Sequence, residues 1–167
     1  MVNPSPTGQG GAGGKDRLRL WFRLLRTARL IEADIRERLR REYETTLPRF
    51  DVMAALYRAP EGMLMSDLSR FLLVSNGNVT GIVERLVAEG LVTRSWRNGD
   101  RRTSMVRLTE AGAARFGAIA AAHERWVEEA LQDVGPGDAT RLVAILDNVR
   151  SRQEDQGGHG TTSTVRR

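Results

Sequence analysis

Residues 75–112 read SNGNVTGIVERLVAEGLVTRSWRNGDRRTSMVRLTEAG, and this stretch decides the fold. Ser75 is a good N-cap for a helix, and Gly90 is a typical C-terminal stop for the same helix. After Gly90 the helical spacing of the apolar residues is lost, and residues 91–96 and 103–108 are rich in Val, Thr and Trp. The segment therefore predicts one helix followed by a two-stranded hairpin.

The flanking sequence is mostly helical in pattern. Pro48 stops a long first helix and can open the next one, and Pro60 to Gly62 is a turn. We expect Tyr57 and Phe71 to face the core. Apolar residues at three- and four-residue steps predict helices over about 16–44, 49–58, 65–72, 75–89, 110–131 and from about 138 onward.

Two short helices separated by a short turn and followed by a hairpin give the element order of a winged helix-turn-helix. We therefore predict a mainly α fold with a small β-hairpin wing and long N- and C-terminal helices. In such folds the second short helix enters the major groove of DNA with its N-terminal residues nearest the bases.

The outer face of the 75–89 helix suits that task. Asn side chains can donate to and accept from one adenine edge, and Ser and Thr can contact phosphates or bases. Gly77 and Gly81 let the backbone approach DNA closely, at a cost of roughly 1 kcal/mol each in helix stability. A solvated polar face is the alternative. The candidate contacts before the wing are Ser66, Ser75, Asn76, Asn78, Thr80 and Arg85.

The hairpin is strongly basic. Five arginines against one acid give residues 91–107 a local net charge of +4. Arginines at a hairpin tip suit phosphates and the narrow minor groove of A/T-rich DNA, and Asp100 can orient Arg102. A generic charged turn is the alternative. The candidate wing contacts are Arg94, Arg97, Asp100, Arg101 and Arg102.

The chain resembles the MarR family of bacterial transcription regulators over residues 16–150. The resemblance is carried by LPRFDVMAAL (47–56), the Gly90 helix exit, the Asp100-Arg101-Arg102 tip and LTEAG (108–112). It implies a homodimer formed by the first and the last two helices, and a minor-groove contact by Arg102 braced by Asp100. Relatives usually begin the 65–72 helix with a Thr cap. Leu64 stands at that position here, so we expect Ser66 to cap the helix later.

Composition limits the function classes. The chain has 167 residues, a formal net charge of +5 and a pI near 10.8, which fits a polyanionic partner. It has no cysteine, no apolar run long enough to span a membrane and no secretory signal pattern, so we expect a cytoplasmic, nucleoid-associated protein.

The two ends are poor in large apolar residues. We expect residues 1–14 and 152–167 to be disordered tails, the second of them basic, with contact between a tail and DNA as the alternative. The domain between them covers residues 15–151. Its DNA-binding lobe spans about 48–108, and its dimerisation helices span about 16–44 and 110–151.

Many relatives are released from DNA by a small aromatic acid or phenol, and the run SNGNVT is similar to relatives that regulate aromatic-acid catabolism, some of which sense aryl-CoA thioesters. An arginine-rich face of the first helix could meet CoA phosphates; a solvated face is the alternative. The candidate ligand residues are Arg19, Trp21, Arg23, Met53, Tyr57, His123 and Trp126. The alternative for them is a purely structural role in the core or at the dimer interface.

No cofactor and no metal are expected, because two histidines and no cysteine leave too few ligands for a zinc site. We find no nucleophile, base or metal constellation, which argues against an enzyme. The sequence favours a regulator, most simply a repressor that a small aromatic acid or aryl-CoA releases from a pseudo-palindromic operator. The alternative is a ligand-independent architectural DNA-binding protein, and a purely helical interaction module would leave the wing unexplained.

Overall fold

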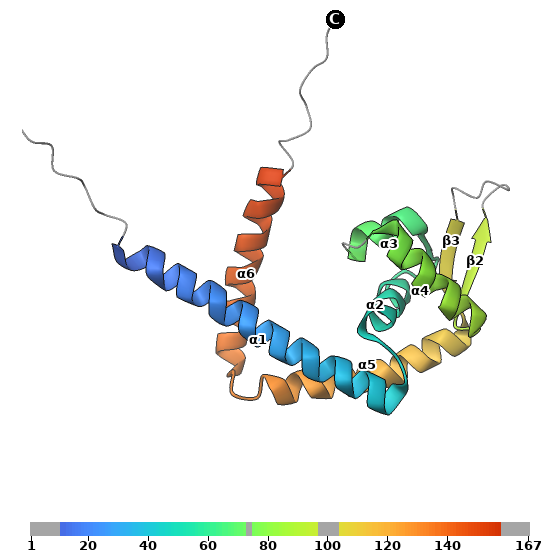
Figure 1. The fold of residues 1–167 in the computed structure, drawn as a ribbon, viewed down its shortest axis with the longest axis horizontal. Helices are drawn as coiled ribbons and strands as arrows, with labels where there is room; N and C mark the ends of the chain where they lie inside the picture. The colour runs from blue at the N-terminus through green and yellow to red at the C-terminus, as the bar shows by residue number, and fades with distance from the viewer. Residues whose placement is uncertain (1–10, 73–74, 97–103, 158–167) are drawn as a thin grey trace, which may run out of the picture. The chain divides into compact units, whose positions relative to one another are not determined.

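The computed structural model describes residues 11–72, 75–96 and 104–157 (Figure 1). The chain divides into two compact units, residues 1–127 and 128–167, which are described separately. The elements in chain order are α1 (Gly11–Tyr43), α2 (Leu47–Tyr57), β1 (Met63–Leu64), α3 (Met65–Leu72), α4 (Asn76–Ala88), β2 (Val92–Trp96), β3 (Ser104–Leu108), α5 (Glu110–Ala130) and α6 (Pro136–Gly157). The predicted class, mainly α with a small β wing, is confirmed.

The C-terminal part of α1 packs in the first unit, where Ile35 and Leu39 are buried. Tyr43 closes the helix against α5, because its ring lies edge-on to Trp126 with centroids 6.0 Å apart and its backbone carbonyl accepts a hydrogen bond from Arg115. In Figure 1 this half of α1 runs alongside α5. The long first helix is therefore anchored at its end, next to the winged helix.

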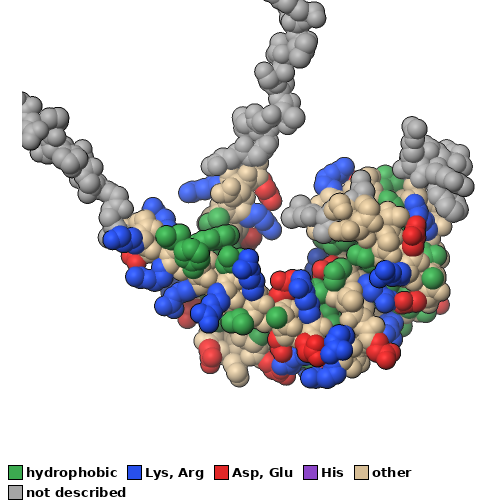
Figure 2. All heavy atoms as spheres, viewed as in Figure 1, with side chains coloured by type: hydrophobic (Ala, Val, Ile, Leu, Met, Phe, Trp, Pro, Cys, Tyr) green, Lys and Arg blue, Asp and Glu red, His purple; other side chains and the backbone are tan. Residues whose placement is uncertain are grey.

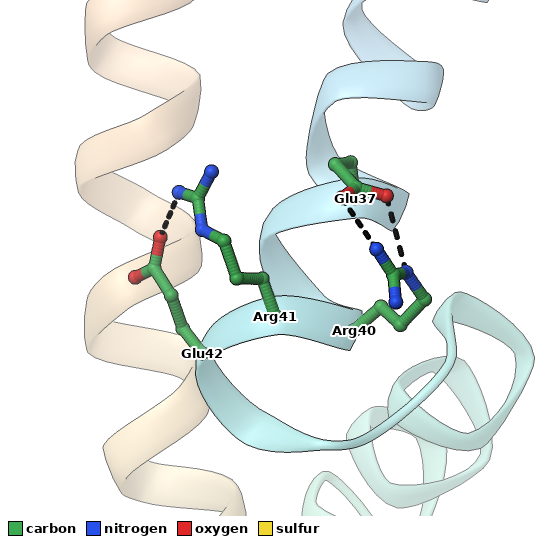
Figure 3. Close-up of polar contacts among 4 residues, drawn as sticks. All are labelled: Glu37, Arg40, Arg41 and Glu42. Carbon is green, nitrogen blue, oxygen red and sulfur yellow. Dashed lines mark hydrogen bonds and ion pairs between the residues drawn. The ribbon is translucent and has the colours of Figure 1, made fainter.

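Two ion pairs lie on the last turns of α1, one between residues three positions apart and one between adjacent residues (Figure 3). Glu37 accepts hydrogen bonds from Arg40 at 2.7 and 3.2 Å, and this contact lowers the pKa of the Glu37 carboxyl and raises that of Arg40. Arg41 pairs with Glu42 at 2.8 Å. These groups are exposed, so they contribute local helix stability and solubility more than core energy.

The winged helix holds the core of the first unit. Helices α2, α3 and α4 pack against a three-stranded antiparallel sheet in the order β1-β3-β2. The side chains that are almost fully buried include Val52, Leu56, Leu68, Val79, Val83, Leu86 and Val106. Burying this apolar set is what orders the short helices, which would not be stable in isolation.

The sequence prediction missed β1. Its two residues pair with β3 in the register Met63 with Val106 and Leu64 with Met105. A two-residue strand has no alternation to detect, and only its distant partner in the sequence defines it. Our expectation that Ser66 caps the next helix was wrong, because α3 begins at Met65, directly after β1, and Ser66 is the second helical residue.

Two side chains expected in the core are exposed instead. Tyr57 is 53% exposed at the end of α2 and Phe71 is 55% exposed near the end of α3. Both helices are short, so a small rotation of the apolar stripe moves a terminal residue out of the core. Tyr57 keeps one face on Phe116, with ring centroids 4.8 Å apart.

The exit from α4 follows the sequence signal. Gly90 adopts φ +72°, a conformation that glycine takes without steric cost, and the N–H groups of Gly90 and Leu91 donate to the carbonyls of Val87 and Leu86. This is a Schellman motif. It turns the chain directly from α4 into β2.

The start of α5 is joined to that exit. Thr109 caps the helix, because its hydroxyl oxygen accepts a hydrogen bond from the Gly112 N–H at 2.9 Å, while the hydroxyl donates to the Gly90 carbonyl at 2.8 Å. The Thr109 N–H donates to the Leu91 carbonyl at 3.0 Å. A Cβ at Gly112 would lie 1.9 Å from the Leu91 carbonyl oxygen, so glycine is needed for this approach.

The second unit consists of the last three residues of α5 and the whole of α6. α6 extends to Gly157, beyond the point where the sequence led us to expect the C-terminal tail, and Arg150 pairs within it with Asp147 at 3.2 Å and Glu154 at 3.9 Å. At the other end of the chain α1 begins at Gly11, inside the expected N-terminal tail. Extending an existing helix adds one hydrogen bond per residue, so both helices continue past their apolar stripes.

We predict that Gly112→Ala lowers the free energy of unfolding by about 3 kcal/mol or more. The added methyl group would overlap the Leu91 carbonyl and force the start of α5 away from the backbone at Leu91. Urea denaturation followed by circular dichroism measures the change. Gly117→Ala is the matched control in the same helix, since nothing lies within 4 Å of its Cβ. The control should gain up to about 1 kcal/mol from helix propensity. Equal effects of the two substitutions would contradict the close approach.

Candidate nucleic-acid interface

Helix α4 presents a face of small and polar residues to solvent. Gly77, Asn78, Gly81 and Arg85 are exposed at helical spacing, while Val79 and Val83 on the other side are fully buried. Nothing lies within 4 Å of a Cβ built at Gly77 or Gly81, so this surface is open. The N-cap residue Ser75 is exposed and extended, with no hydrogen bond from its side chain to the helix end.

The other predicted DNA contacts fall at several places in the first unit. Ser66 is exposed on α3, Thr80 is partly buried on α4, and Arg94 is partly buried on β2, opposite Val106. The Nε atom of Arg94 is buried without a hydrogen-bond partner among the described residues. The side chain of Asn76 and residues Arg97, Asp100, Arg101 and Arg102 lie outside the described residues.

A groove of about 540 Å³ lies between the start of α2 and the exposed face of α4. Asn78 and Arg85 line it from α4, and Arg49 and Asp51 line it from α2. Its apolar wall includes Pro48, Leu72 and Ile82. The groove adjoins the small-residue face of α4, so a ligand or a DNA backbone bound there would contact the same residues.

An ion pair across the groove region was not foreseen from the sequence. Arg49 on α2 pairs with Glu89, the C-cap residue of α4, and only 17% of the Arg49 side chain is exposed. The two residues are 40 positions apart, and neither lies in a recognisable motif. The pair ties the end of the exposed helix to the start of α2, and so helps to fix the orientation of α4.

Asp51 completes the charged lining. It is partly buried, and burial, with Glu32 nearby on α1, raises the pKa of its carboxyl while Arg36 opposes the shift. The groove therefore contains both signs of charge close to apolar surface. It can accommodate polar and anionic groups on the arginine side.

The matches to known proteins agree with this geometry. The chain matches the family model described as MarR family over residues 43–103. It is 32% identical over 154 residues to the transcriptional activatory protein BadR of Rhodopseudomonas palustris, a match that covers 88% of this chain and 86% of the relative. A crystal structure of a MarR family transcriptional regulator from Silicibacter pomeroyi has 34% sequence identity and a TM-score of 0.70, covering 84% of this chain and 96% of the other.

The chain belongs to the MarR family. It is a DNA-binding transcriptional regulator and not an enzyme, as the sequence predicted. A mutant form of MarR from E. coli, crystallised in complex with operator DNA, has the same fold, with a TM-score of 0.70, 21% identity and coverage of 83% of this chain and 99% of that one.

The candidate ligand residues of this MarR protein fall into separate groups. Met53 and Trp126 are buried, at 1% and 5% exposure, and Arg38 lies over the Trp126 ring at 5.9 Å. His123 stacks on Phe50 with centroids 4.7 Å apart, and burial lowers the pKa of its imidazole.

Tyr57 lines a different groove, at the base of the sheet. Arg19, Trp21 and Arg23 are exposed on the N-terminal half of α1. The seven candidates therefore do not line one cavity within the first unit. Sequence spacing could not separate residues that pack in the core from residues that are free to bind.

Two negative findings apply to this MarR protein over its described residues. No group of three or more His, Cys, Asp or Glu side chains is placed to hold a metal ion. None of its described helices has both the length and the apolar composition to cross a bilayer.

We predict that Glu89→Gln lowers the free energy of unfolding by about 1 kcal/mol, because the largely buried Arg49 side chain loses its carboxylate partner. Thermal and urea unfolding measure the loss, and Arg49→Gln in the Glu89→Gln background should add little. The control is Glu37→Gln, which breaks the exposed pair with Arg40 and should lower the free energy of unfolding by clearly less than Glu89→Gln does. Additive losses at Arg49 and Glu89 would show that the pair does not couple the helices.

Proposed function

We propose that this MarR-family regulator binds a pseudo-palindromic operator as a homodimer, represses transcription from it, and is released by a small aromatic acid or an aryl-CoA thioester. The observation that carries the proposal is the exposed face of α4. Gly77 and Gly81 flank Asn78, whose amide can both donate to and accept from an adenine edge, and among the described residues nothing lies within 4 Å of a Cβ at either glycine.

The charges around α4 support a DNA contact. Arg85 is exposed on the same face of the helix, and Arg94 follows on β2. We assign Ser66, Ser75, Asn76 and Thr80 to the same interface, with Arg97, Asp100, Arg101 and Arg102 in the wing. Phosphate contacts of this kind position the helix, while base contacts select the sequence.

Exposed apolar side chains on the two terminal helices support the homodimer. On α1 they include Trp21 and Leu24, and on α6 they include Val143, Ile145 and Val149. Large apolar side chains gathered on an exposed helix face are typical of association surfaces. A two-fold dimer would present two copies of α4 to half-sites about one helical turn apart, on the order of 10 bp.

We predict that Asn78→Ala reduces the ratio of operator affinity to random-duplex affinity by about tenfold, since a bidentate amide–adenine contact discriminates by about 1–3 kcal/mol. Fluorescence anisotropy with both duplexes at one salt concentration measures the ratio. The control is Glu84→Gln on the same helix, which removes a negative charge and should raise both affinities together. Equal losses on both duplexes after Asn78→Ala would exclude base reading by Asn78.

An architectural DNA-binding protein is the second candidate function. It shares the basic wing but would show little preference among sequences and no release by a ligand. The operator-to-random ratio of the unaltered protein separates the two candidates directly.

For the effector, we expect one member of a series of benzoates, hydroxycinnamates and their CoA thioesters to release the protein from the region upstream of its own gene. Release is expected because a ligand that binds the free form better than the DNA-bound form shifts the equilibrium toward dissociation. Anisotropy titration measures it. A reporter in cells lacking the protein gives the sign of regulation: higher expression indicates a repressor, and lower expression indicates an activator, as the name of BadR states for that relative.

A further inference from the structure

The N-terminal half of α1 forms an exposed basic arm, which we define as residues 13–30. Every side chain in the arm is exposed except that of Leu25, which is half-buried. Figure 2 shows blue and green side chains interleaved over this part of α1. Its acid is Asp16, and its basic residues are Lys15, Arg17, Arg19, Arg23, Arg26 and Arg29.

Helix geometry divides the arm into two sides. Trp21 and Ala28 lie on the side that continues, at helical spacing, into the buried residues Ile35 and Leu39. The opposite side carries a basic stripe at steps of three and four residues, consisting of Lys15, Arg19, Phe22, Arg23 and Arg26. The proposed dimer contact uses the first side and leaves the basic stripe available.

The basic stripe, together with the neighbouring Leu18, lines a groove of about 430 Å³. Phe22, in its middle, is 59% exposed. Arg19 pairs with Asp16 at 2.9 Å, while Arg23 and Arg26 have no ion pair with any residue in the described part of the chain. The groove therefore combines an exposed ring with two guanidinium groups that are available to bind an anion.

This combination specifies a class of ligand. A simple anion would use the arginines and leave the Phe22 ring in water, and an apolar ligand would use the ring and leave the charges unused. A ligand with both phosphates and a flat heterocycle uses both, because guanidinium groups bind phosphates in a forked geometry and an aromatic ring stacks on a base.

We propose that the basic stripe binds the adenine-and-phosphate end of a nucleotide-type effector, such as the CoA moiety of an aryl-CoA thioester. The inference rests on the proposed effector control and names the part of the chain that would hold the effector. The stripe runs from Lys15 to Arg26, about 16 Å along the helix axis, which is long enough for a ring and more than one phosphate.

Duplex DNA suits the stripe less well. The bases of a duplex are stacked on one another and cannot stack on Phe22. The stripe also lies far from the packed end of α1. Its last residue, Arg26, is about 13 Å along the helix axis from the buried Ile35, where packing beside the winged helix begins.

The test is isothermal titration calorimetry of the full-length protein with adenosine 3′,5′-bisphosphate, without DNA. Arg23→Gln/Arg26→Gln should weaken binding by about tenfold or more, because two charge-assisted contacts are lost. The matched control, Arg17→Gln/Arg29→Gln, removes the same charge from the arm at positions that do not line the groove, and should bind close to the unaltered protein. Phe22→Leu keeps the apolar volume and should lose about tenfold for the bisphosphate but not for pyrophosphate.

Four results would overturn the proposal. They are no binding of the bisphosphate at millimolar concentration, equal losses in the two charge variants, no effect of Phe22→Leu, and a loss of operator affinity in Arg23→Gln/Arg26→Gln as large as the loss of nucleotide affinity. The last result would assign the stripe to DNA. Because the ligand is titrated without DNA, failure here leaves operator recognition by α4 intact, and failure of Asn78→Ala leaves nucleotide binding intact.

Discussion

The junction at Thr109 is the constraint on which the winged helix depends. Its hydroxyl group accepts from the first turn of α5 and donates to the Gly90 carbonyl at the end of α4, while its N–H donates to the Leu91 carbonyl at the start of β2. Three elements therefore share one residue. Gly112 allows this because a side chain at that position would overlap the Leu91 backbone. The end of α4, the base of the wing and the start of α5 are held in one arrangement.

The junction also helps to stabilise α4, a helix whose sequence has low helix propensity. Gly77 and Gly81 make the exposed face of α4 suitable for close approach to DNA, but each lowers helix stability by roughly 1 kcal/mol. The opposite side compensates, because Val79, Val83 and Leu86 are fully buried. The Arg49–Glu89 pair adds a second tie at the C-terminal end. Packing on one side of α4 thus supports the exposed face that we propose contacts DNA.

Helix α1 shows how one element can serve more than one role. Ile35 and Leu39 are buried in its C-terminal part, Tyr43 contacts α5, and its N-terminal arm is exposed. Because a helix repeats every 3.6 residues, the arm separates an apolar side from the basic stripe. Our proposals assign the apolar side to dimerisation and the stripe to a nucleotide-type effector, and the two sides can act together because they do not share residues.

The sequence by itself determined the order of the helices and of the two wing strands, the Gly90 stop and the Thr109 cap, because these depend on local signals. Gly90, Thr109 and the apolar spacing of residues 75–89 needed no knowledge of distant neighbours. Only the tertiary structure decided which side chains meet. It paired Met63 and Leu64 with β3, joined Arg49 to Glu89, exposed Tyr57 and Phe71, and separated buried Trp126 from exposed Trp21. Those outcomes depend on how helices rotate and cross in a packed core, which the spacing within any one segment does not fix.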